Sequence, residues 1–175
     1  MSKLAASSPP GSNRLLYLPY LQGERTPVWD SQARGLFIGL TVSTGRSDLA
    51  RAVFEGVAFA LRQVVECAES EITEIRAVGG GTRSRLWNQI KADVLQVPLH
   101  VLTFQETGTL GAALLAGVGG GVYSSLEEAA CVAEQVVSSE LIVPDAALAS
   151  LYDELFAVYA EIYPQTDSLM HKLGH

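Results

Sequence analysis

Cysteine and histidine are scarce in this sequence, which limits the sites it can build. Its two cysteines, Cys67 and Cys131, lie in apolar helical contexts. We therefore expect two buried, reduced thiols and no disulfide framework. The three histidines, His100, His171 and His175, have no spacing typical of metal ligands. The sequence therefore predicts no metal site.

Positive charge and long apolar runs are also lacking. The net charge is −7, and lysine and arginine occur singly, with no basic stripe. Nucleic acid is therefore not an expected partner. No apolar run approaches the roughly 18 residues that a membrane span needs, so we do not expect a membrane partner. The first 13 residues lack the apolar core of a signal peptide, and the expected location is the cytoplasm.

Apolar residues are plentiful and follow a helical period in the first half of the chain. Hydrophobic residues make up 48% of 175 residues, enough for one globular domain. Residues 1–13 are rich in Ser, Pro and Gly, which predicts an irregular segment. From Asp48 to Val65, apolar residues recur every three or four positions, which predicts one apolar helix face. Gly56 lies on that face, and we expect a close neighbour there.

The second half alternates between strand and helix patterns. Strands are predicted at 74–78 and 99–104. Helices are predicted at 85–96, 108–119, 126–137 and 145–163, the last closed by Pro164. This alternation indicates an α/β domain with parallel pairing. Two strands make a thin sheet, so either 14–40 supplies more strands or part of the sheet lies outside the chain.

Three consecutive glycines, Gly79, Gly80 and Gly81, stand between the strand at 74–78 and the helix that follows. Such a turn can bring a ligand close to backbone amides at a helix N-terminus. The sequence GGGTRS matches neither the dinucleotide fingerprint nor a Walker A loop. A tight turn packed against a neighbour explains the glycines equally well at this stage.

Ser84 and Asn88 lie one helical turn apart beside these glycines. They could contact a base or ribose, or serve as a helix N-cap and a solvated amide. Arg83 and Arg85 could approach phosphates or simply be exposed. In the stretch 106–117, which includes most of the helix predicted at 108–119, the glycines leave part of the helix surface nearly bare, either for a flat ligand or another backbone, or for helix-on-sheet packing. No catalytic residues are predicted, because no Ser/His/Asp cluster or Cys/His pair is present.

Several segments together resemble the C-terminal domain of the FGGY family of carbohydrate kinases. GLFIGLTVSTGRSDLARAVFE (35–55) resembles the second signature of that family. LPYLQGERTPVWDSQARG (18–35) resembles the preceding loop, above all in the xylulokinase branch, where His is usual at the position of Val28. VGGGTRSRLWNQIKADVL resembles the adenosine-binding segment, and ETGTLGAALLAG its companion helix. The resemblance runs from about residue 14 to residue 172.

The resemblance implies an actin-like ATPase fold with two ribonuclease H-like lobes. In such kinases ATP and Mg²⁺ bind between the lobes, and the γ-phosphoryl group moves to a sugar hydroxyl. It implies that Gly79, Gly80 and Gly81 lie along the adenosine, with Ser84 and possibly Asn88 near the base or ribose. D-xylulose is the expected sugar; glycerol, gluconate, ribulose and rhamnulose are the alternatives.

The resemblance also implies that much of a kinase is missing. Residues 14–175 correspond to a partial C-terminal lobe that lacks its first sheet strands. The N-terminal lobe, with its Asp-x-Gly-Thr/Ser loop and base aspartate, is absent, and the Mg²⁺ site lies mostly outside the chain. The chain is thus expected to be part of a sugar kinase. Alternatively, it is a non-catalytic domain that binds a nucleotide or a protein, and its exposed sheet edge would favour self-association or a homodimer.

Overall fold

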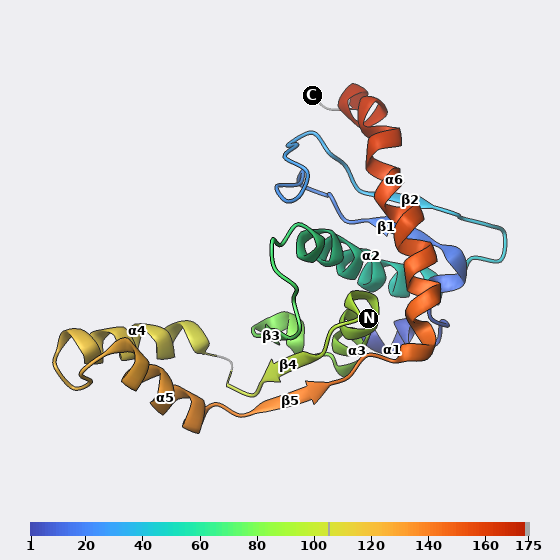
Figure 1. Ribbon diagram of the computed structural model, residues 1–175. Helices are drawn as coiled ribbons and strands as arrows, with labels where there is room; N and C mark the ends of the chain where they lie inside the picture. The colour runs from blue at the N-terminus through green and yellow to red at the C-terminus, as the bar shows by residue number, and fades with distance from the viewer. Residues whose placement is uncertain (105, 174–175) are drawn as a thin grey trace.

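The computed structural model describes residues 1–104 and 106–173, and it is an α/β structure (Figure 1). Its helices are α1 (Ser2–Ala5), α2 (Arg46–Glu66), α3 (Arg85–Leu95), α4 (Thr107–Gly119), α5 (Leu126–Val136) and α6 (Ala149–Leu173). Single turns of 3-10 helix are η1 (Ser12–Arg14), η2 (Gly80–Thr82) and η3 (Ala146–Leu148). The strands are β1 (Leu16–Leu18), β2 (Leu36–Ile38), β3 (Ile75–Ala77), β4 (Leu99–Leu102) and β5 (Ser139–Ile142).

The larger sheet has the strand order β3-β4-β5. β3 and β4 run parallel, with Ile75 opposite Leu99, which confirms the predicted parallel pair. β5 is antiparallel to β4 and was not predicted. Its sequence, SELI, buries only Ile142, so it lacks the alternating apolar pattern by which a strand is normally found.

β1 and β2 form a separate antiparallel pair, with Leu16 opposite Ile38. Residues 14–40 therefore do supply strands, but these strands do not extend the larger sheet. Within the described part of the chain that sheet stays three strands wide, and β3 lies at its edge.

α2 lies at the centre of the packing and contacts α1, β1, α3 and α6. The core around it is rich in buried aromatic side chains, among them Tyr20, Phe59, Tyr152 and Tyr159. The close neighbour expected at Gly56 is β1: a β-carbon at Gly56 would overlap the carbonyl oxygen of Tyr17. The glycine thus lets a helix and a strand touch by their backbones.

The buried face of α2 differs from the prediction, because it contains polar residues. Asp48, Arg51 and Glu55 are all buried. Arg51 donates from Nε to Glu55 at 2.7 Å, and Ser8 donates from Oγ to Asp48 at 2.6 Å. A hydrophobic period cannot detect such a face, since the polar groups are hidden by pairing with one another.

The N-terminal segment supplies many of these partners. Residues 1–13, expected to be irregular, contain α1 and part of η1 and pack on α2. The Gly11 amide donates to Glu55 Oε1 at 2.9 Å, and Ser12 Oγ donates to Glu55 Oε2 at 2.7 Å. Asn13 Nδ2 donates to Asp48 at 3.0 Å. The segment is thus held to α2 by buried polar contacts.

Two further expectations were wrong. α6 does not end at Pro164 but runs through it to Leu173. Contacts beyond the proline hold the last turns: Met170 is buried, and its Sδ accepts from the Arg34 amide at 3.3 Å. The two cysteines are free, as expected, but both are exposed.

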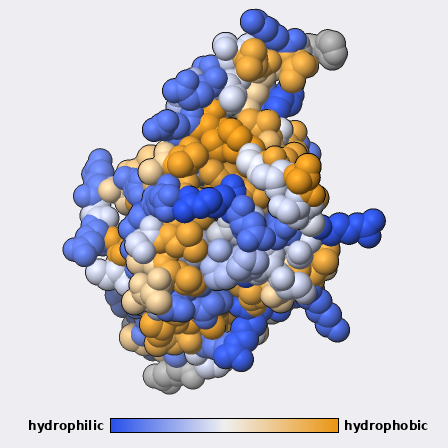
Figure 2. All heavy atoms as spheres, turned by 90° about the vertical axis from the view of Figure 1, so that its right-hand side faces the viewer, coloured by the Kyte–Doolittle hydropathy of each residue, from blue (hydrophilic) through white to orange (hydrophobic). Residues whose placement is uncertain are grey.

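α4 and α5 form a hairpin that extends away from the rest of the molecule (Figure 1). α4 is apolar along most of its length, yet it has no buried residue. Figure 2 shows the molecule from the side on which α6 lies in Figure 1. Hydrophilic and hydrophobic side chains are interspersed across that face. Among the described residues, no helix combines the length and the apolar character needed to cross a membrane.

Candidate functional site

The glycine turn follows β3, one of the two parallel strands. Gly79, Gly80 and Gly81 lead from β3 through η2 into α3. β4 ends nearby, at Leu102, and is followed by α4. Because parallel strands end at the same edge of a sheet, this is the edge at which α/β domains usually bind ligands.

The backbone of the turn explains only part of its glycine content. Gly79 has φ +88° and ψ −175°, a conformation that side chains rarely permit. No such restriction applies to Gly80. A β-carbon at Gly79 or Gly80 would meet no described atom within 4 Å, whereas one at Gly81 would lie 3.3 Å from Trp87. Of the three glycines, only Gly81 therefore packs against a described neighbour, and open space lies beside the other two.

The carbonyl groups of the turn are held by side chains of the chain itself. Thr82 Oγ1 donates to the Gly79 carbonyl at 2.8 Å, and Asn88 Nδ2 donates to the Thr82 carbonyl at 2.7 Å. Lys91 Nζ donates to the Gly81 carbonyl at 3.3 Å. Since its inner side is fixed in this way, the turn can keep its open side in one shape.

Ser84 is the N-cap of α3. Its Oγ accepts from the Trp87 amide at 3.3 Å and lies 2.9 Å from Ser2 Oγ. The sequence allowed Ser84 to be either a ligand contact or a helix N-cap, and the structure shows that it is an N-cap. Ser84 is half-buried, beside the turn but not within it.

Asn88 lies behind the turn and does not reach the open side. It is only 3% exposed, so the solvated-amide interpretation is wrong. Its Nδ2 binds the Thr82 carbonyl, while its Oδ1 is buried without a hydrogen-bond partner among the described residues. Asn88 thus supports the turn from inside, and direct contact with a ligand would require it to move.

Lys91 belongs to the same inner layer and was missed in the sequence. It is 8% exposed, its ammonium lies 5.0 Å from the centre of the Trp87 ring, and burial lowers its pKa. Trp87 in turn stacks on Phe54 of α2, with ring centres 5.2 Å apart. The spacing could have identified Lys91, because it follows Asn88 by three residues and so lies on the same helix face.

Arg83, Arg85 and the glycines of α4 were also considered as ligand contacts, and the two arginines are better explained as exposed surface residues. Arg83 and Arg85 are exposed, and Arg85 has only a distant ion-pair partner, Glu140 at 3.8 Å. At the start of α4, a β-carbon at Gly108 or Gly111 would meet nothing described within 4 Å. The bare face of α4 is therefore not packed on the sheet.

The order and geometry of these elements agree with a sequence comparison. The family model described as "FGGY family of carbohydrate kinases, C-terminal domain" matches residues 1–120. This chain belongs to the FGGY family. The match includes residues 1–13, so the segment that packs on α2 is part of the family domain.

Individual FGGY kinases match over almost the whole chain. A xylulose kinase from Staphylococcus epidermidis is 40% identical over 169 residues, which are 95% of this chain and 34% of that protein. In the structure of ligand-bound xylulose kinase from Lactobacillus acidophilus, the match has a TM-score of 0.88 at 34% identity. It covers 98% of this chain and 35% of the other.

More distant members also match. The structure of Plasmodium falciparum glycerol kinase with ADP has a TM-score of 0.75 at 25% identity, covering 91% of this chain and 32% of the other. Gluconokinases and a glycerol kinase are among the sequence relatives. The relatives are thus named for several polyols and sugars. The chain spans about a third of the length of the xylulose kinases that it matches.

Proposed function

We propose that this chain is the nucleotide-binding C-terminal part of an ATP-dependent sugar kinase, and that its glycine turn contacts the nucleoside of ATP. The main support is the open space over Gly79 and Gly80 at the ligand-binding edge of the parallel strands. A flat base or ribose can approach a backbone closely only where no β-carbon projects.

In this proposal each residue of the turn has a different task. Gly79 and Gly80 offer the contact surface, and Gly81 makes room for Trp87. Ser84 lies at the side, where its hydroxyl could bind the base or ribose if it left its capping bond. Asn88 holds the turn in place from behind and does not touch the nucleotide.

The chemistry itself needs groups from elsewhere. Bound ATP would supply the γ-phosphoryl group, and phosphoryl transfer depends on positioning and on charge stabilisation. The described residues contain no group of three or more His, Cys, Asp or Glu that could hold a metal ion. Mg²⁺ in kinases is typically held by one or two carboxylates together with the phosphates of ATP, and we propose that most of its site lies outside this chain. We therefore assign no catalytic residue to the described part of this chain, the proposed partial lobe. We infer that the base, the phosphate loops and most sugar contacts come from polypeptide outside it.

D-xylulose is the proposed sugar, because over almost the whole chain the xylulose kinase from S. epidermidis is 40% identical, whereas a gluconokinase that matches a similar length is 32% identical. Gluconate and glycerol remain alternatives, since kinases for both are among the relatives. The cytoplasm, where ATP is available, is the proposed location.

Calorimetric titration with ATP and ADP tests the proposal. Gly80→Val should weaken binding at least about tenfold, because the new side chain would fill the space reserved for the nucleoside. It should leave the fold intact, since a β-carbon there meets nothing described within 4 Å. Gly119→Val, at the far end of α4, is the matched control: it also has free space and should leave binding unchanged.

Two results would count against the proposal. If the unaltered chain shows no binding at millimolar nucleotide, it does not bind nucleotide by itself. If Gly80→Val binds as well as the unaltered chain, the nucleoside does not lie on the turn.

A further inference from the structure

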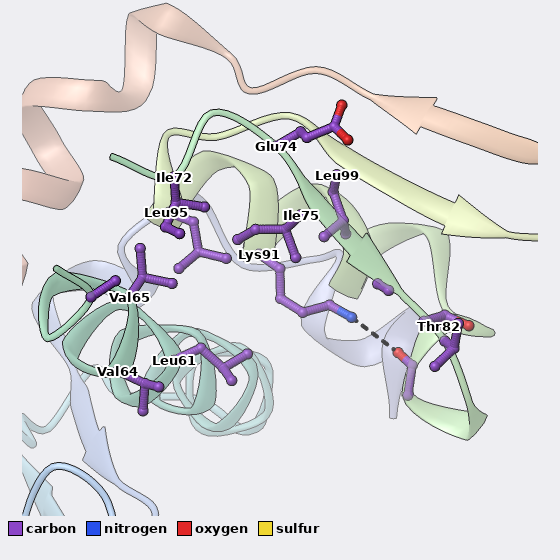
Figure 3. A pocket seen from close by; sticks show the side chains of 14 residues that line it. Leu61, Val64, Val65, Ile72, Glu74, Ile75, Thr82, Lys91, Leu95 and Leu99 are labelled. Atoms are coloured by element: carbon purple, nitrogen blue, oxygen red, sulfur yellow. Dashed lines mark hydrogen bonds between the residues drawn. The ribbon is translucent and has the colours of Figure 1, made fainter. Parts of the chain in front are cut away.

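Lys91 places a buried positive charge in apolar surroundings. Its side chain is 8% exposed and lines a pocket of about 570 Å³, whose other charged lining residue is Glu74. Figure 3 shows the lysine extending from α3 past Ile75 toward the turn that carries Thr82. Glu74 pairs with Arg76 at 3.5 Å, and no carboxylate of the described residues forms an ion pair with Lys91. Burial without such a partner disfavours the charged form of a lysine.

The glycine turn supplies the polar contact of this ammonium. Lys91 Nζ donates to the Gly81 carbonyl at 3.3 Å and lies 5.0 Å from the centre of the Trp87 ring. Gly81 packs on the same ring, since a β-carbon there would lie 3.3 Å from it. The ammonium thus contacts both the turn and the ring on which the turn packs. A charged donor binds a carbonyl oxygen and an aromatic face more strongly than a neutral donor does.

Trp87 connects this cluster to α2. Its ring stacks on Phe54, with ring centres 5.2 Å apart, and its Nε1 donates to the Phe54 carbonyl at 3.3 Å. Phe54 belongs to the buried core. The position of the ring is therefore fixed by the core, and Lys91 fastens the turn to that fixed ring.

The stability of the fold does not account for the charge of Lys91. A methionine has a similar length and would fill the same apolar space without the cost of burying an ammonium. Replacing a buried charge by an apolar side chain of similar volume is often neutral or stabilising. A methionine cannot, however, donate to the Gly81 carbonyl. The charge therefore matters for the turn more than for the core.

We propose that Lys91 is a positioning residue for nucleotide binding: its ammonium holds the Gly81 carbonyl from the inner side and so keeps Gly79 and Gly80 in the shape that the nucleoside meets. The proposal rests on the proposed function. A deprotonated Lys91 would donate a weaker hydrogen bond and would lose its attraction to the Trp87 ring. Nucleotide affinity should therefore depend on the protonation of Lys91, which does not itself touch the nucleotide.

Lys91→Met tests the role of the charge. Calorimetry should show that it binds ADP about tenfold more weakly than the unaltered chain at pH 7. Its midpoint of unfolding in urea should be unchanged or higher, because the apolar side chain removes a desolvation cost. Lys172→Met is the matched control: it makes the same substitution at an exposed lysine in the last turn of α6 and should change neither quantity.

The pH dependence of ADP binding separates positioning from simple packing. Burial lowers the pKa of Lys91 and is its one recorded cause, since no described ionisable group of α2 or β3 shifts it. The protonated form holds the turn, so the affinity of the unaltered chain should fall toward that of Lys91→Met between about pH 7 and pH 10. Other groups that titrate, Glu74 included, affect both proteins and cancel in the ratio of the two affinities.

Hydrogen exchange without nucleotide tests the hold on the turn directly. The Thr82 and Arg83 amides donate to the Gly79 and Gly80 carbonyls at 3.0 and 3.4 Å. In Lys91→Met these two amides should exchange at least about fivefold faster, because the turn opens more often. In Lys172→Met their exchange should be unchanged.

Three results would overturn the proposal. The first is that Lys91→Met binds ADP as well as the unaltered chain, and the second is an affinity ratio that stays constant from pH 7 to pH 10. The third is unchanged exchange at Thr82 and Arg83 in Lys91→Met. If the unaltered chain binds no ADP, the proposed function fails and the effect on affinity fails with it. The exchange measurement then still decides whether Lys91 holds the turn.

Discussion

The two halves of α2 have opposite surroundings. Its first half, up to Gly56, is enclosed by the N-terminal segment, β1 and α6, and even the charged residues Asp48, Arg51 and Glu55 are buried. Its second half, from Val57 to Glu66, buries only Ala58 and Phe59. From Ala60 onward it has no buried residue, although it carries Leu61, Val64 and Val65.

In the enclosed half, the buried carboxylate of Glu55 has hydrogen-bond donors for both of its oxygens. Glu55 accepts hydrogen bonds from Gly11, Ser12, Arg51 and Tyr152, at 2.7 to 2.9 Å. Buried charge is stable only when it is paired in this way. In the open half, Leu61 and Val64 are each 40% exposed, and no described residue covers them. The same helix thus combines a polar-paired, buried segment with an apolar segment left partly exposed.

Glu55→Ala should have the largest effect, because it disrupts the enclosed half. Glu55 is 1% exposed, and its removal leaves the Arg51 guanidinium buried without its carboxylate. We expect the free energy of unfolding to fall by about 3–5 kcal/mol. Urea unfolding followed by circular dichroism measures this. Glu66→Ala, at the exposed end of the same helix, should change it by no more than about 0.5 kcal/mol. Equal losses in the two variants would contradict the comparison.

Asp30→Asn should have a smaller effect that depends on pH. His171 and Tyr163 of α6 each contact Asp30 Oδ2 at 2.7 Å. Hydrogen bonds from His171, Tyr163 and the Gln32 amide lower the pKa of Asp30 to about 2. A lowered carboxyl pKa stabilises the fold above the unfolded value, near 3.8, and this contribution is lost as the pH falls through about 2.

The melting temperatures of the two proteins should therefore differ at pH 7 and converge between about pH 4 and pH 2. Tyr163→Phe removes one donor and should reproduce part of the difference. A gap between the unaltered chain and Asp30→Asn that stays constant across this range would show that the carboxylate is not involved.

Val64→Asp should have the smallest effect on the isolated chain. The side chain is 40% exposed in the open half, so the charge remains in water, and the free energy of unfolding should change by about 0.5 kcal/mol or less. The same urea experiment measures it. A loss well above 1 kcal/mol would mean that the Val64 side chain is buried in the isolated chain.

The sequence predicted the elements that depend on local pattern. The parallel pair β3–β4, the helices after each of these strands and the close contact at Gly56 all follow from periodicity and glycine placement. Where long-range contacts decide the structure, the sequence was misleading. α6 continues through Pro164 because His171 and Met170 in its last turns bind Asp30 and Arg34, more than a hundred residues away in sequence. The polar face of α2 depends on partners from residues 8–13.

The candidate site was predictable in position but not in the roles of its residues. Three glycines after a strand located the turn. The three-dimensional structure was needed to show that Gly79 and Gly80 face open space. It also shows that Asn88 and Lys91 donate hydrogen bonds to carbonyl groups on the inner side of the turn. Side chains three or four positions apart share a helix face, but the spacing does not say whether that face looks toward the ligand or the core.

Nuclear magnetic resonance with ADP would test the central claim most directly. Amide resonances of Gly79, Gly80 and Gly81 should shift together as ADP is added, while those of Gly11 and Gly56, in the enclosed half, stay in place. If millimolar ADP leaves all five unchanged, or if Gly11 and Gly56 shift while the turn does not, the glycine turn is not the nucleotide site.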